Sequence, residues 1–437
     1  MGANRIIFLV TIMFMAGAIA GAICSPVFAK EITVGDDSEA DFISIQKAVN
    51  NSSSGDVILV LPGIYNESVS VRTGGLSILS KSGNPEDTVI QAFNLAASNT
   101  VVDGFSIYEN VSMRPVYASS QRFIENCTLR NNLFLENNSG VILGNCYNST
   151  VENNIFLRSD TGIDGIECNN CVFSGNRLSD SRIYLSSGGS ETNITIVNNT
   201  LQNSQIGISY CSRNKILNNT IDGSGLSPSG VGIIESHDNI IDNNSIFNCS
   251  DGICACFISG GNYITNNTLT SNTRGIIVCH YSPENLIKNN IISNNSIGLS
   301  LGDTALVTGN RIELNKESGI YLDLSVEDSS SGSNLTHIIY NNFFNNTVNL
   351  FNNTEIENPR HSIQEVDEAV WNTTKTSGKN IVGGPYLGGN YWAKPDGTGF
   401  SEVCIDLDGD WICDSSYNIN GSEVDYLPLS SLSRPQI

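Results

Sequence analysis

A recurring pair of asparagines constrains the fold of this 437-residue chain more than any other feature. When Asn-Asn and Gly-Asn pairs are aligned, the second Asn recurs at intervals of 20 to 25 residues. The positions are Asn132, Asn154, Asn176, Asn199, Asn219, Asn244, Asn267, Asn290 and Asn310. A period of this size predicts a solenoid, in which each repeat is one coil stacked on its neighbours. It argues against a compact fold without internal similarity.

Each repeat also tends to carry a glycine followed by an aliphatic residue, as in Gly162-Ile163, Gly252-Ile253 and Gly275-Ile276. Around these marks the apolar residues form short runs rich in β-branched side chains, which predict strands and have no helical period. A leucine-rich horseshoe has a similar period, but its Leu-x-x-Leu-x-Leu units are missing. We therefore predict an all-β chain, a right-handed single-stranded parallel β-helix with coils of about 22 residues.

Asparagine suits such a coil for two physical reasons. A short coil must turn sharply at fixed places, and Asn and Gly enter the left-handed backbone region at least cost. Stacked once per coil, Asn side-chain amides can also hydrogen-bond along a ladder with a spacing of ~4.8 Å. Inward Ile, Leu, Val and Phe residues would form a continuous core, and residues 57–354 would hold roughly a dozen coils.

The two ends of an open solenoid are unpaired sheet edges, which predicts a cap at each end. We assign residues 30–56 to an N-terminal helical cap, because Phe42, Ile45, Ala48 and Val49 follow helical spacing. Residues 355–437 would form a small C-terminal capping module, which contains all three tryptophans of the chain.

Residues 1–29 are typical of a secretory signal peptide. Arg5 precedes an apolar run that ends at Cys24, and Val27-Phe28-Ala29 provides a cleavage site before Lys30. The run just reaches membrane-spanning length, so an uncleaved N-terminal anchor stays open as an alternative. We expect a secreted or cell-surface protein. Its many Asn-x-Ser/Thr sequons suit glycosylation, although the asparagine repeat itself also generates them.

Charge narrows the range of partners. Asp and Glu outnumber Lys and Arg by 44 to 22, which gives a net charge of −22. This charge would repel phosphate backbones and anionic lipid surfaces. We expect neither nucleic acid nor, apart from a possible uncleaved anchor, a membrane as partner. Cations and neutral or basic glycans suit the surface better.

The cysteine spacing predicts disulfides, since export brings oxidising conditions. Cys146 and Cys168 occupy equivalent positions in adjacent coils, and so do Cys256 and Cys279. Equivalent Cα atoms of stacked coils lie ~4.8 Å apart, which a disulfide can bridge. We predict both pairs. Buried, reduced thiols that act as small apolar residues stay the alternative.

Several segments carry a family resemblance. Ile45-Gln46-Lys47-Ala48-Val49, then Gly55-Asp56-Val57-Ile58 and Pro62-Gly63-Ile64-Tyr65, resemble the opening of pectate-lyase-like parallel β-helix proteins. The coils resemble the carbohydrate-binding and sugar-hydrolase (CASH) repeats, which are grouped with the NosD-like periplasmic copper-binding family. The tail resembles the same set as found in archaeal surface proteins, in Gly388-Gly389-Asn390-Tyr391-Trp392 and Asp425-Tyr426-Leu427-Pro428-Leu429.

The resemblance implies a fold more than an activity, because this fold hosts lyases, hydrolases, epimerases and proteins without catalysis. NosD-like proteins are implicated in copper-site maturation of an exported reductase, so the resemblance also implies copper delivery. Copper sites favour thioether, thiolate and imidazole ligands. Met113 is the only methionine after residue 29, and His237, His280, His337 and His361 are dispersed. We therefore do not expect a copper cofactor.

Counting from the Gly-Ile marks gives candidates for acid–base catalysis. Arg213 and Asp238 fall at the same offset in adjacent coils, and Glu235 lies on the same turn. His237 and His280 share an offset two coils apart. Acids, imidazoles and a basic residue on one face can serve as general acids and bases. An exposed ion pair between Arg213 and Asp238 explains their stacking equally well.

The paired Asp-Asp and Gly-His-Gly signatures of polygalacturonase relatives are missing from the predicted coils, residues 57–354. We therefore favour a non-catalytic module that binds carbohydrate or a neighbouring envelope protein. A polysaccharide lyase or glycoside hydrolase is the alternative, and copper delivery the second alternative. Exposed aromatic residues are expected to be few in the coils, so glycan binding would be weak and multivalent.

The tail contains an acidic loop. Its four carboxylates lie within nine residues, at Asp406, Asp408, Asp410 and Asp414. Alternating carboxylates are the hard oxygen ligands of calcium loops, and a bound cation would relieve their repulsion. Cys404 and Cys413 bracket the loop and could close it as a disulfide. We predict a Ca²⁺ site, although no Glu stands at the twelfth position as in an EF-hand.

Overall fold

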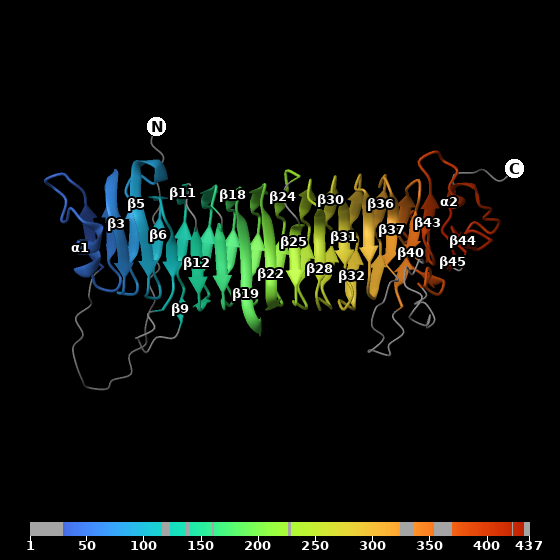
Figure 1. Ribbon diagram of the computed structural model, residues 1–437, viewed down its shortest axis with the longest axis horizontal. Helices are drawn as coiled ribbons and strands as arrows, with labels where there is room; N and C mark the ends of the chain where they lie inside the picture. The colour runs from blue at the N-terminus through green and yellow to red at the C-terminus, as the bar shows by residue number, and fades with distance from the viewer. Residues whose placement is uncertain are drawn as a thin grey trace, which may run out of the picture.

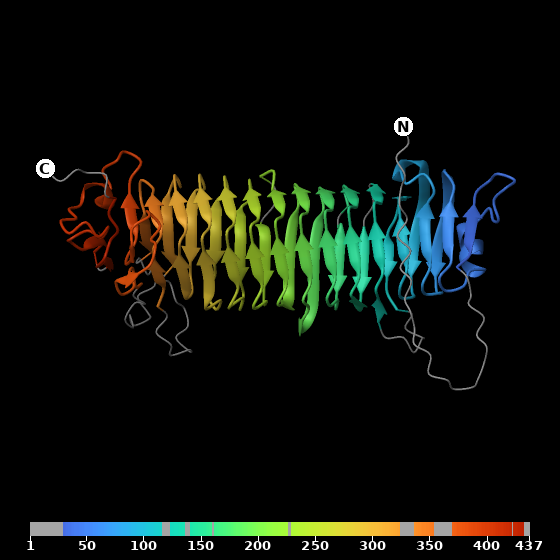
Figure 2. The same cartoon turned by 180° about the vertical axis from the view of Figure 1, so that it is seen from behind.

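The chain forms a long parallel β-solenoid of about 12 turns, as the asparagine repeat predicts (Figure 1). The computed structural model describes residues 29–115, 123–135, 140–159, 161–225, 229–323, 336–353, 369–421 and 423–431. Helix α1 (Ile45–Asn50) lies at one end of the rod, and helix α2 (Phe400–Val403) at the other, as both views show (Figure 1; Figure 2). Between them the solenoid is built almost entirely of short strands.

Three columns of parallel strands, here called faces A, B and C, run along the rod. Face A is a 14-stranded sheet. Its strands are β1 (Glu31–Val34), β2 (Val57–Val60), β4 (Ser77–Ser80), β6 (Val101–Asp103), β10 (Thr128–Arg130), β14 (Thr150–Glu152), β17 (Val172–Ser174), β20 (Thr195–Val197), β23 (Lys215–Leu217), β26 (Ile240–Asp242), β29 (Tyr263–Thr265), β32 (Asn285–Lys288), β35 (Ala305–Thr308) and β38 (Ile338–Tyr340).

Faces B and C together form a 25-stranded sheet, because β3 (Gly63–Val71) and β5 (Thr88–Leu95) extend across both. Face B continues through β7 (Ser106–Ile107), β11 (Leu133–Leu135), β15 (Ile155–Leu157), β18 (Arg177–Ser179), β21 (Thr200–Gln202), β24 (Thr220–Asp222), β27 (Ser245–Phe247), β30 (Thr268–Thr270), β33 (Ile291–Ser293), β36 (Arg311–Glu313), β39 (Phe343–Asn345) and β43 (Tyr391–Ala393).

Face C continues through β8 (Val111–Met113), β12 (Val141–Gly144), β16 (Ile163–Ile166), β19 (Arg182–Glu191), β22 (Gln205–Ser212), β25 (Ser229–Ile234), β28 (Asp251–Cys256), β31 (Arg274–Val278), β34 (Ile297–Leu301), β37 (Ser318–Asp323) and β40 (Leu350–Asn353). The remaining elements are small. They are the 3-10 turn η1 (Pro85–Asp87), the parallel pair β9 (Ile124–Glu125) and β13 (Cys146–Tyr147), and the antiparallel pairs β41 (Thr376–Ser377) with β42 (Tyr386–Leu387) and β44 (Tyr417–Asn420) with β45 (Glu423–Asp425).

Each coil passes from face A to face B, then to face C, and returns to face A one coil further along. The three turns between faces are here called the A–B, B–C and C–A corners. Because strands alternate their side chains, the middle residue of a three-residue strand points inward. Val151, Phe173 and Ile196 are such residues on neighbouring face A strands, and all three are fully buried. Their stacked side chains form the continuous core.

The two asparagines of each repeat have different tasks at the A–B corner. The first residue of the pair adopts a left-handed backbone conformation, as in Asn153 with φ of 54° and Asn243 with φ of 54°. Glycine takes this position at Gly175 and Gly309. The second Asn, for example Asn244, is buried inside the corner. Sequence reasoning gave both tasks to one type of residue, and the structure divides them between two neighbours.

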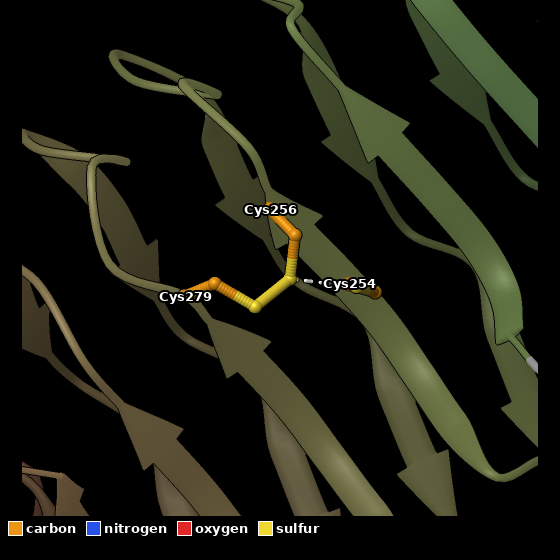
Figure 3. Close-up of side chains that lie close together, drawn as sticks. All are labelled: Cys254, Cys256 and Cys279. Atoms are coloured by element: carbon orange, nitrogen blue, oxygen red, sulfur yellow. Dashed lines mark hydrogen bonds between the residues drawn. A yellow bond between two sulfur atoms is a disulfide. The ribbon is translucent and has the colours of Figure 1, made fainter.

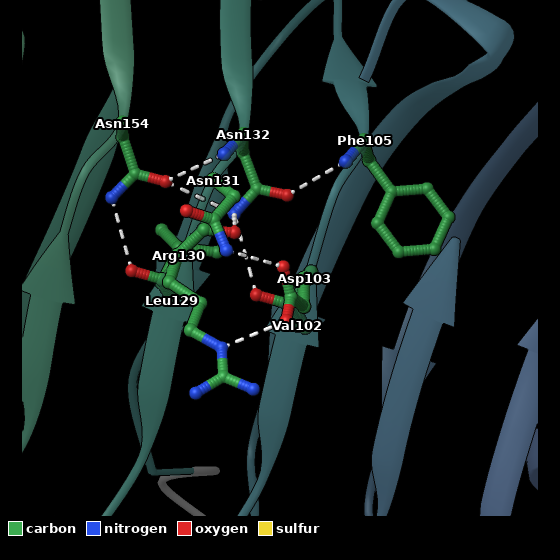
Figure 4. Close-up of polar contacts among 8 residues, drawn as sticks. All are labelled: Val102, Asp103, Phe105, Leu129, Arg130, Asn131, Asn132 and Asn154. Atoms are coloured by element: carbon green, nitrogen blue, oxygen red, sulfur yellow. Dashed lines mark hydrogen bonds and ion pairs between the residues drawn. The ribbon is translucent and has the colours of Figure 1, made fainter. Parts of the chain in front are cut away.

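The buried asparagines form an unbroken ladder from Asn132 to Asn390. Each side-chain amide donates to the side-chain oxygen of the next coil's Asn at 2.9 to 3.1 Å. The same oxygen also accepts the backbone N–H of the Asn before it, as Asn154 does from Asn132 at 3.0 Å (Figure 4). The ladder begins where Asn132 accepts the N–H of Phe105.

The other two corners carry shorter ladders of the same kind. At the C–A corner Asn214 donates to Asn239, which donates to Asn262. At the B–C corner Asn295 donates to Asn315, which donates to Asn346. All these asparagines are buried. Their ladders therefore provide hydrogen-bond partners for polar groups of the turns that water cannot reach.

The ends of the solenoid extend into the regions assigned to the caps. β1 pairs with β2, so face A begins at Glu31, inside residues 30–56. α1 buries Ile45, Ala48 and Val49, and Ser44 accepts the Lys47 N–H at its start. That α1 caps the solenoid stays a prediction. Among the described residues, no helix is both long and apolar enough to cross a membrane. Residues 1–28 of the expected signal peptide lie outside the described part.

The C-terminal tail also contributes to the solenoid rather than only following it. β43 pairs with β39, and Asn390 is the last Asn of the A–B ladder. The buried Asp425 carboxylate accepts the Asn390 N–H at 2.7 Å and the Trp392 indole N–H at 2.8 Å. Burial raises the pKa of Asp425 to about 7, and these N–H donors offset only part of the effect.

Replacing one ladder asparagine should destabilise the protein strongly. Asn244→Ala removes the acceptor of the Asn219 N–H, one of the two acceptors of the Asn219 amide, and the side-chain donor to the Ile216 carbonyl. Because each such group costs ~1–3 kcal/mol when buried, we expect the free energy of unfolding to fall by at least about 3 kcal/mol in a urea titration. The control Asn243→Gly changes the neighbouring left-handed residue and should cost less than about 1 kcal/mol. Equal losses in the two variants would contradict this account of the ladder.

Asp425 should make the C-terminal module less stable as the pH rises. Its pKa is raised from 3.8 to about 7 in the folded protein, so the folded state holds a proton that the unfolded state has lost. The stabilisation is complete below pH ~4 and is lost as the pH passes ~7, at ~1.4 kcal/mol per pKa unit. We expect tryptophan fluorescence to report easier unfolding at pH 8 than at pH 5. Asp425→Asn should flatten this dependence, and an unchanged slope would contradict the assignment.

Candidate functional site

The C–A corner departs from the asparagine rule in four successive coils. Its turns connect β22 to β23, β25 to β26, β28 to β29 and β31 to β32. Left-handed backbone positions in and beside these turns hold residues other than Asn or Gly. They are Tyr210, Arg213, Glu235, Asp238, Phe257, Ile258, Tyr281 and Glu284, with φ between 47° and 62°. We call this set the corner ridge.

The left-handed conformation is unfavourable for such side chains, by roughly 1–2 kcal/mol per residue relative to the right-handed region. Ile258 is an extreme case, because a β-branched residue is rarely found there. Asn and Gly fill most equivalent positions along the rod at lower cost. A concentration of strained residues of other types is typical of a functional surface, where the side chain matters more than the backbone conformation.

The corner ridge exposes large apolar side chains. Phe257 is 67% exposed, Tyr281 57%, Ile258 56% and Tyr210 45%. The expectation of few exposed aromatic residues in the coils is therefore wrong at this corner. Sequence spacing could not identify them, because inward and outward aromatic residues look alike until the register of each turn is known. The signal available was the replacement of an expected Asn by an aromatic residue at a turn.

The structure brings the predicted catalytic residues to one corner but pairs them differently. Arg213 forms an ion pair with Glu191 of the preceding coil, and the expected ion pair with Asp238 is not formed. The longer β19 strand brings Glu191 beside Ser212, directly before Arg213, which explains the difference. Glu235 instead hydrogen-bonds the Tyr210 hydroxyl, which raises the pKa of Tyr210.

The two histidines of this set, His237 and His280, contact different residues. His237 Nδ1 accepts the Gly260 N–H at 3.3 Å. His280 Nε2 lies 3.5 Å from a carboxylate oxygen of Asp323. One coil separates His237 from His280, as the offset count predicts. Neither is positioned against the other for a shared proton transfer.

Two hollows in the described surface are lined by other residues. One, at the B–C corner, is open and polar, and its lining includes Asp222, Asn248, Ser271, Asn294 and Lys316. The second lies beside α1, with Gln46 and Arg72 among its lining residues. Arg213, Glu235, His237, Asp238 and His280 line neither hollow. Arg213, His237 and Asp238 are exposed and Glu235 and His280 are half-buried, so water reaches these side chains.

The cysteines separate into two groups. Cys256 and Cys279 form a disulfide, as predicted, with Cα atoms 4.7 Å apart. The predicted Cys146–Cys168 disulfide is wrong, because both residues are free thiols in the core. Cys146 donates to the Met113 carbonyl at 3.1 Å and Cys168 to the Ile166 carbonyl at 3.5 Å. A hydrogen bond with Cys146 and burial raise the pKa of the Cys168 thiol, so it is inert.

A third cysteine lies beside the Cys256–Cys279 disulfide. Cys254 Sγ is 3.0 Å from Cys256 Sγ, and all three sulfur atoms lie within 4.8 Å of one another (Figure 3). Burial raises the pKa of the Cys254 thiol to about 12. Sequence reasoning missed this residue. The signal was the Cys-x-Cys spacing, which places both side chains on one face of a strand.

The acidic loop brings together three of its four carboxylates. Asp406, Asp408 and Asp414 each offer an oxygen, and these atoms lie within 4.8 Å of one another. Asp410 instead forms an ion pair with Lys375, so this predicted ligand lies outside the group. Burial raises the pKa of Asp406, against the lowering effect of N–H donors from Trp411 and Gly409. The Cys404–Cys413 disulfide brackets the loop, as the spacing suggested.

The copper ligands considered from sequence are not assembled. Met113 and His337 are buried, whereas His237 and His280 lie in turns of different coils. His361 lies outside the described residues. The described part of the fold thus places Met113, His237, His280 and His337 in separate parts of the solenoid.

The family of the chain follows from a comparison with family models. The model of the periplasmic copper-binding protein NosD matches residues 49–225 and 183–397. Together these ranges cover most of the solenoid, so the chain belongs to the NosD family. No curated protein matches the sequence.

Solved structures with a similar fold include enzymes and an adhesin. An alginate lyase of family PL6, AlyGC, is 15% identical with a TM-score of 0.41 and covers 78% of this chain, which spans 53% of the lyase. A mannuronic acid-specific family 6 lyase from human gut microbiota is 14% identical with a TM-score of 0.41, over 75% of this chain and 83% of its own. PfbA, a surface adhesin of Streptococcus pneumoniae, is 15% identical with a TM-score of 0.40, over 70% and 85%. The chain thus spans about half the length of the first of these proteins.

Calcium should stabilise the acidic loop if its three grouped carboxylates bind the ion. A bound Ca²⁺ would neutralise adjacent charges that otherwise repel one another. We expect millimolar calcium to raise the melting temperature and a chelator to reverse the rise. Asp408→Asn should abolish the calcium-dependent shift, whereas Asp410→Asn, which alters the Lys375 ion pair, should preserve it. The same shift in both variants would contradict the three-carboxylate site.

Proposed function

We propose that this protein is an exported, non-catalytic module that binds neutral or basic polysaccharide along its corner ridge. The observation that carries the proposal is the set of strained, exposed aromatic residues at the C–A corner, above all Phe257. Aromatic rings stack well on the C–H faces of sugar rings, because the stacking removes apolar surface from water. The description of the family as periplasmic supports export.

The mixture of side chains on the ridge favours a glycan over a protein partner. Tyr210, Phe257 and Tyr281 offer ring faces, while Glu235, Asp238 and Glu284 offer carboxylates at neighbouring turns. A sugar presents the complementary combination of apolar faces and hydroxyl groups in every residue. A polysaccharide that runs along the rod could repeat these contacts from coil to coil, so weak individual contacts would add up.

The charge of the chain supports a neutral or basic glycan. The net charge of −22 opposes the binding of polyanions such as alginate. Glu235 and Asp238 add negative charge on the ridge, and Arg213 is already paired with Glu191. An amino sugar polymer would gain from this field, and a neutral glucan would not be repelled.

The same contacts favour binding over catalysis. Arg213 is committed to an ion pair, and His237 accepts a backbone hydrogen bond. General acid–base catalysis on a glycan needs groups that converge on one bond, usually in a cleft that excludes water. A lyase or hydrolase remains the competing function, and it would release unsaturated products or reducing ends from polysaccharide.

Phe257→Asn should separate function from stability. Asn suits the left-handed conformation of this residue, so the free energy of unfolding should rise by about 1 kcal/mol. The loss of the ring should weaken polysaccharide binding about fivefold, which corresponds to ~1 kcal/mol of stacking. Affinity electrophoresis through gels that contain chitosan, a neutral soluble glucan or alginate measures the binding, and urea unfolding measures the stability.

Leu314→Asn is the matched control. Leu314 also has a positive φ, 55°, and is 48% exposed, but it lies at the B–C corner. The variant should gain the same stability and bind polysaccharide like the wild type. If neither chitosan nor the glucan retards the wild type, or if the two variants bind alike, the proposed binding surface is wrong. Release of reducing ends from any of the polysaccharides would favour the enzyme instead.

A further inference from the structure

Cys254, Cys256 and Cys279 form an outward cluster of sulfur atoms, in contrast to the other cysteines of the coils. Cys254 and Cys256 are alternate residues of β28, so their side chains leave the same face of the strand. Cys279 follows β31 on the next coil and completes the cluster (Figure 3). Of the seven free cysteines among the described residues, six are buried and only Cys254 is partly exposed.

A structural disulfide does not account for the third sulfur. Cys256 and Cys279 already tie adjacent coils together, and that bond needs no further thiol. Cys254 Sγ nevertheless lies 3.0 Å from Cys256 Sγ. A thiolate at this place could exchange with the disulfide, and the raised pKa of Cys254 keeps the thiol protonated and suppresses that exchange. A role that uses all three sulfur atoms accounts for its position.

We propose that, once the disulfide is reduced, Cys254, Cys256 and Cys279 bind one Cu(I) ion through their three thiolates. Three sulfur atoms within 4.8 Å of one another can reach a common ion. Thiolates are soft ligands that select Cu(I), whereas a structural Zn²⁺ site needs a fourth ligand. The cluster of potential ligands found among the described residues at this place contains only these three cysteines.

The chemistry has two separate steps. An external dithiol first reduces the Cys256–Cys279 bond, which breaks the S–S bond, adds two protons and leaves the reductant as a disulfide. The three thiols then exchange three protons for one Cu(I) ion. The oxidised protein has only the Cys254 thiol at this place and should not hold the ion. The disulfide therefore controls the binding of the metal.

This inference revises the expectation that copper plays no part. That expectation considered methionine and histidine, which the fold keeps apart or buries. The cysteine cluster provides a donor set of the right softness, and the family to which the chain belongs is described as copper-binding. The inference does not depend on the polysaccharide proposal, because the two use different side chains and different ligands.

The test is a competition for Cu(I) under anaerobic conditions with the full mature chain. Protein is reduced with a phosphine, desalted, and titrated against a coloured Cu(I)–bicinchoninate complex. The reduced wild type should remove one equivalent of Cu(I), and Cys254→Ser should bind at least tenfold more weakly. X-ray absorption of the loaded wild type should show sulfur neighbours only. Bound Cu(I) should also protect Cys254 from alkylation by iodoacetamide.

Three controls keep the result interpretable. Cys254→Ser leaves the disulfide intact, so its melting temperature before reduction reports any general loss of folding. Cys211→Ser removes a free thiol that is buried in the core and should not alter the affinity. The double variant Cys404→Ser, Cys413→Ser removes the other reducible disulfide and should also bind normally. The proposal is overturned if the reduced wild type does not compete, if Cys254→Ser competes equally well, or if the oxidised protein binds the same ion.

Discussion

The buried asparagine ladder at the A–B corner is the interaction on which the solenoid depends. A coil this short must reverse direction at three corners, and each corner places backbone groups where water cannot reach them. The Asn side chain satisfies several of these groups at once. Asn244, for example, accepts from the backbone and amide of Asn219 and donates to the Ile216 carbonyl and to Asn267. Each coil therefore completes the hydrogen bonds of the coil beside it, and no coil is satisfied alone.

Because the fold is specified from within, the outer surface of a corner is free to vary. The ladder residue and the inward aliphatic residues determine the position of a coil, and the exposed left-handed residue has only to tolerate its conformation. Asn and Gly do so at most positions. At the C–A corner Phe257 and Ile258 occupy such positions at a cost that the ladder through Asn239 and Asn262 can sustain. Residues with an unfavourable backbone conformation can therefore be kept at the surface of a corner without loss of the fold.

Features that recur in every coil could be predicted from the sequence. Contacts that depend on an irregularity of one coil could not. The period identified the coils, and the equivalent positions of Cys256 and Cys279 were sufficient to predict their disulfide. The same counting failed for Cys146 and Cys168, which do lie together in the core but as hydrogen-bonded free thiols rather than as a disulfide. It failed for Arg213 and Asp238 because the long β19 strand brings Glu191 within reach of the guanidinium, which no repeat predicts. Local irregularities in individual coils decide such contacts.

Side-chain direction also explains why the sulfur cluster of Cys254, Cys256 and Cys279 was hard to recognise from the sequence. Cys211 and Cys249 are buried thiols that fill the core as a small apolar residue would. In the sequence, Cys254 is another cysteine of the repeat and nothing in its residue type sets it apart from Cys211 and Cys249. In the structure it lies between the inward residues Ile253 and Ala255 of β28, so its side chain leaves the opposite face of the strand. That shift by a single residue moves a thiol from the core to the surface and places it beside a disulfide. In a solenoid, where every coil supplies the same backbone, the side on which a residue emerges determines its chemistry as much as the residue itself does.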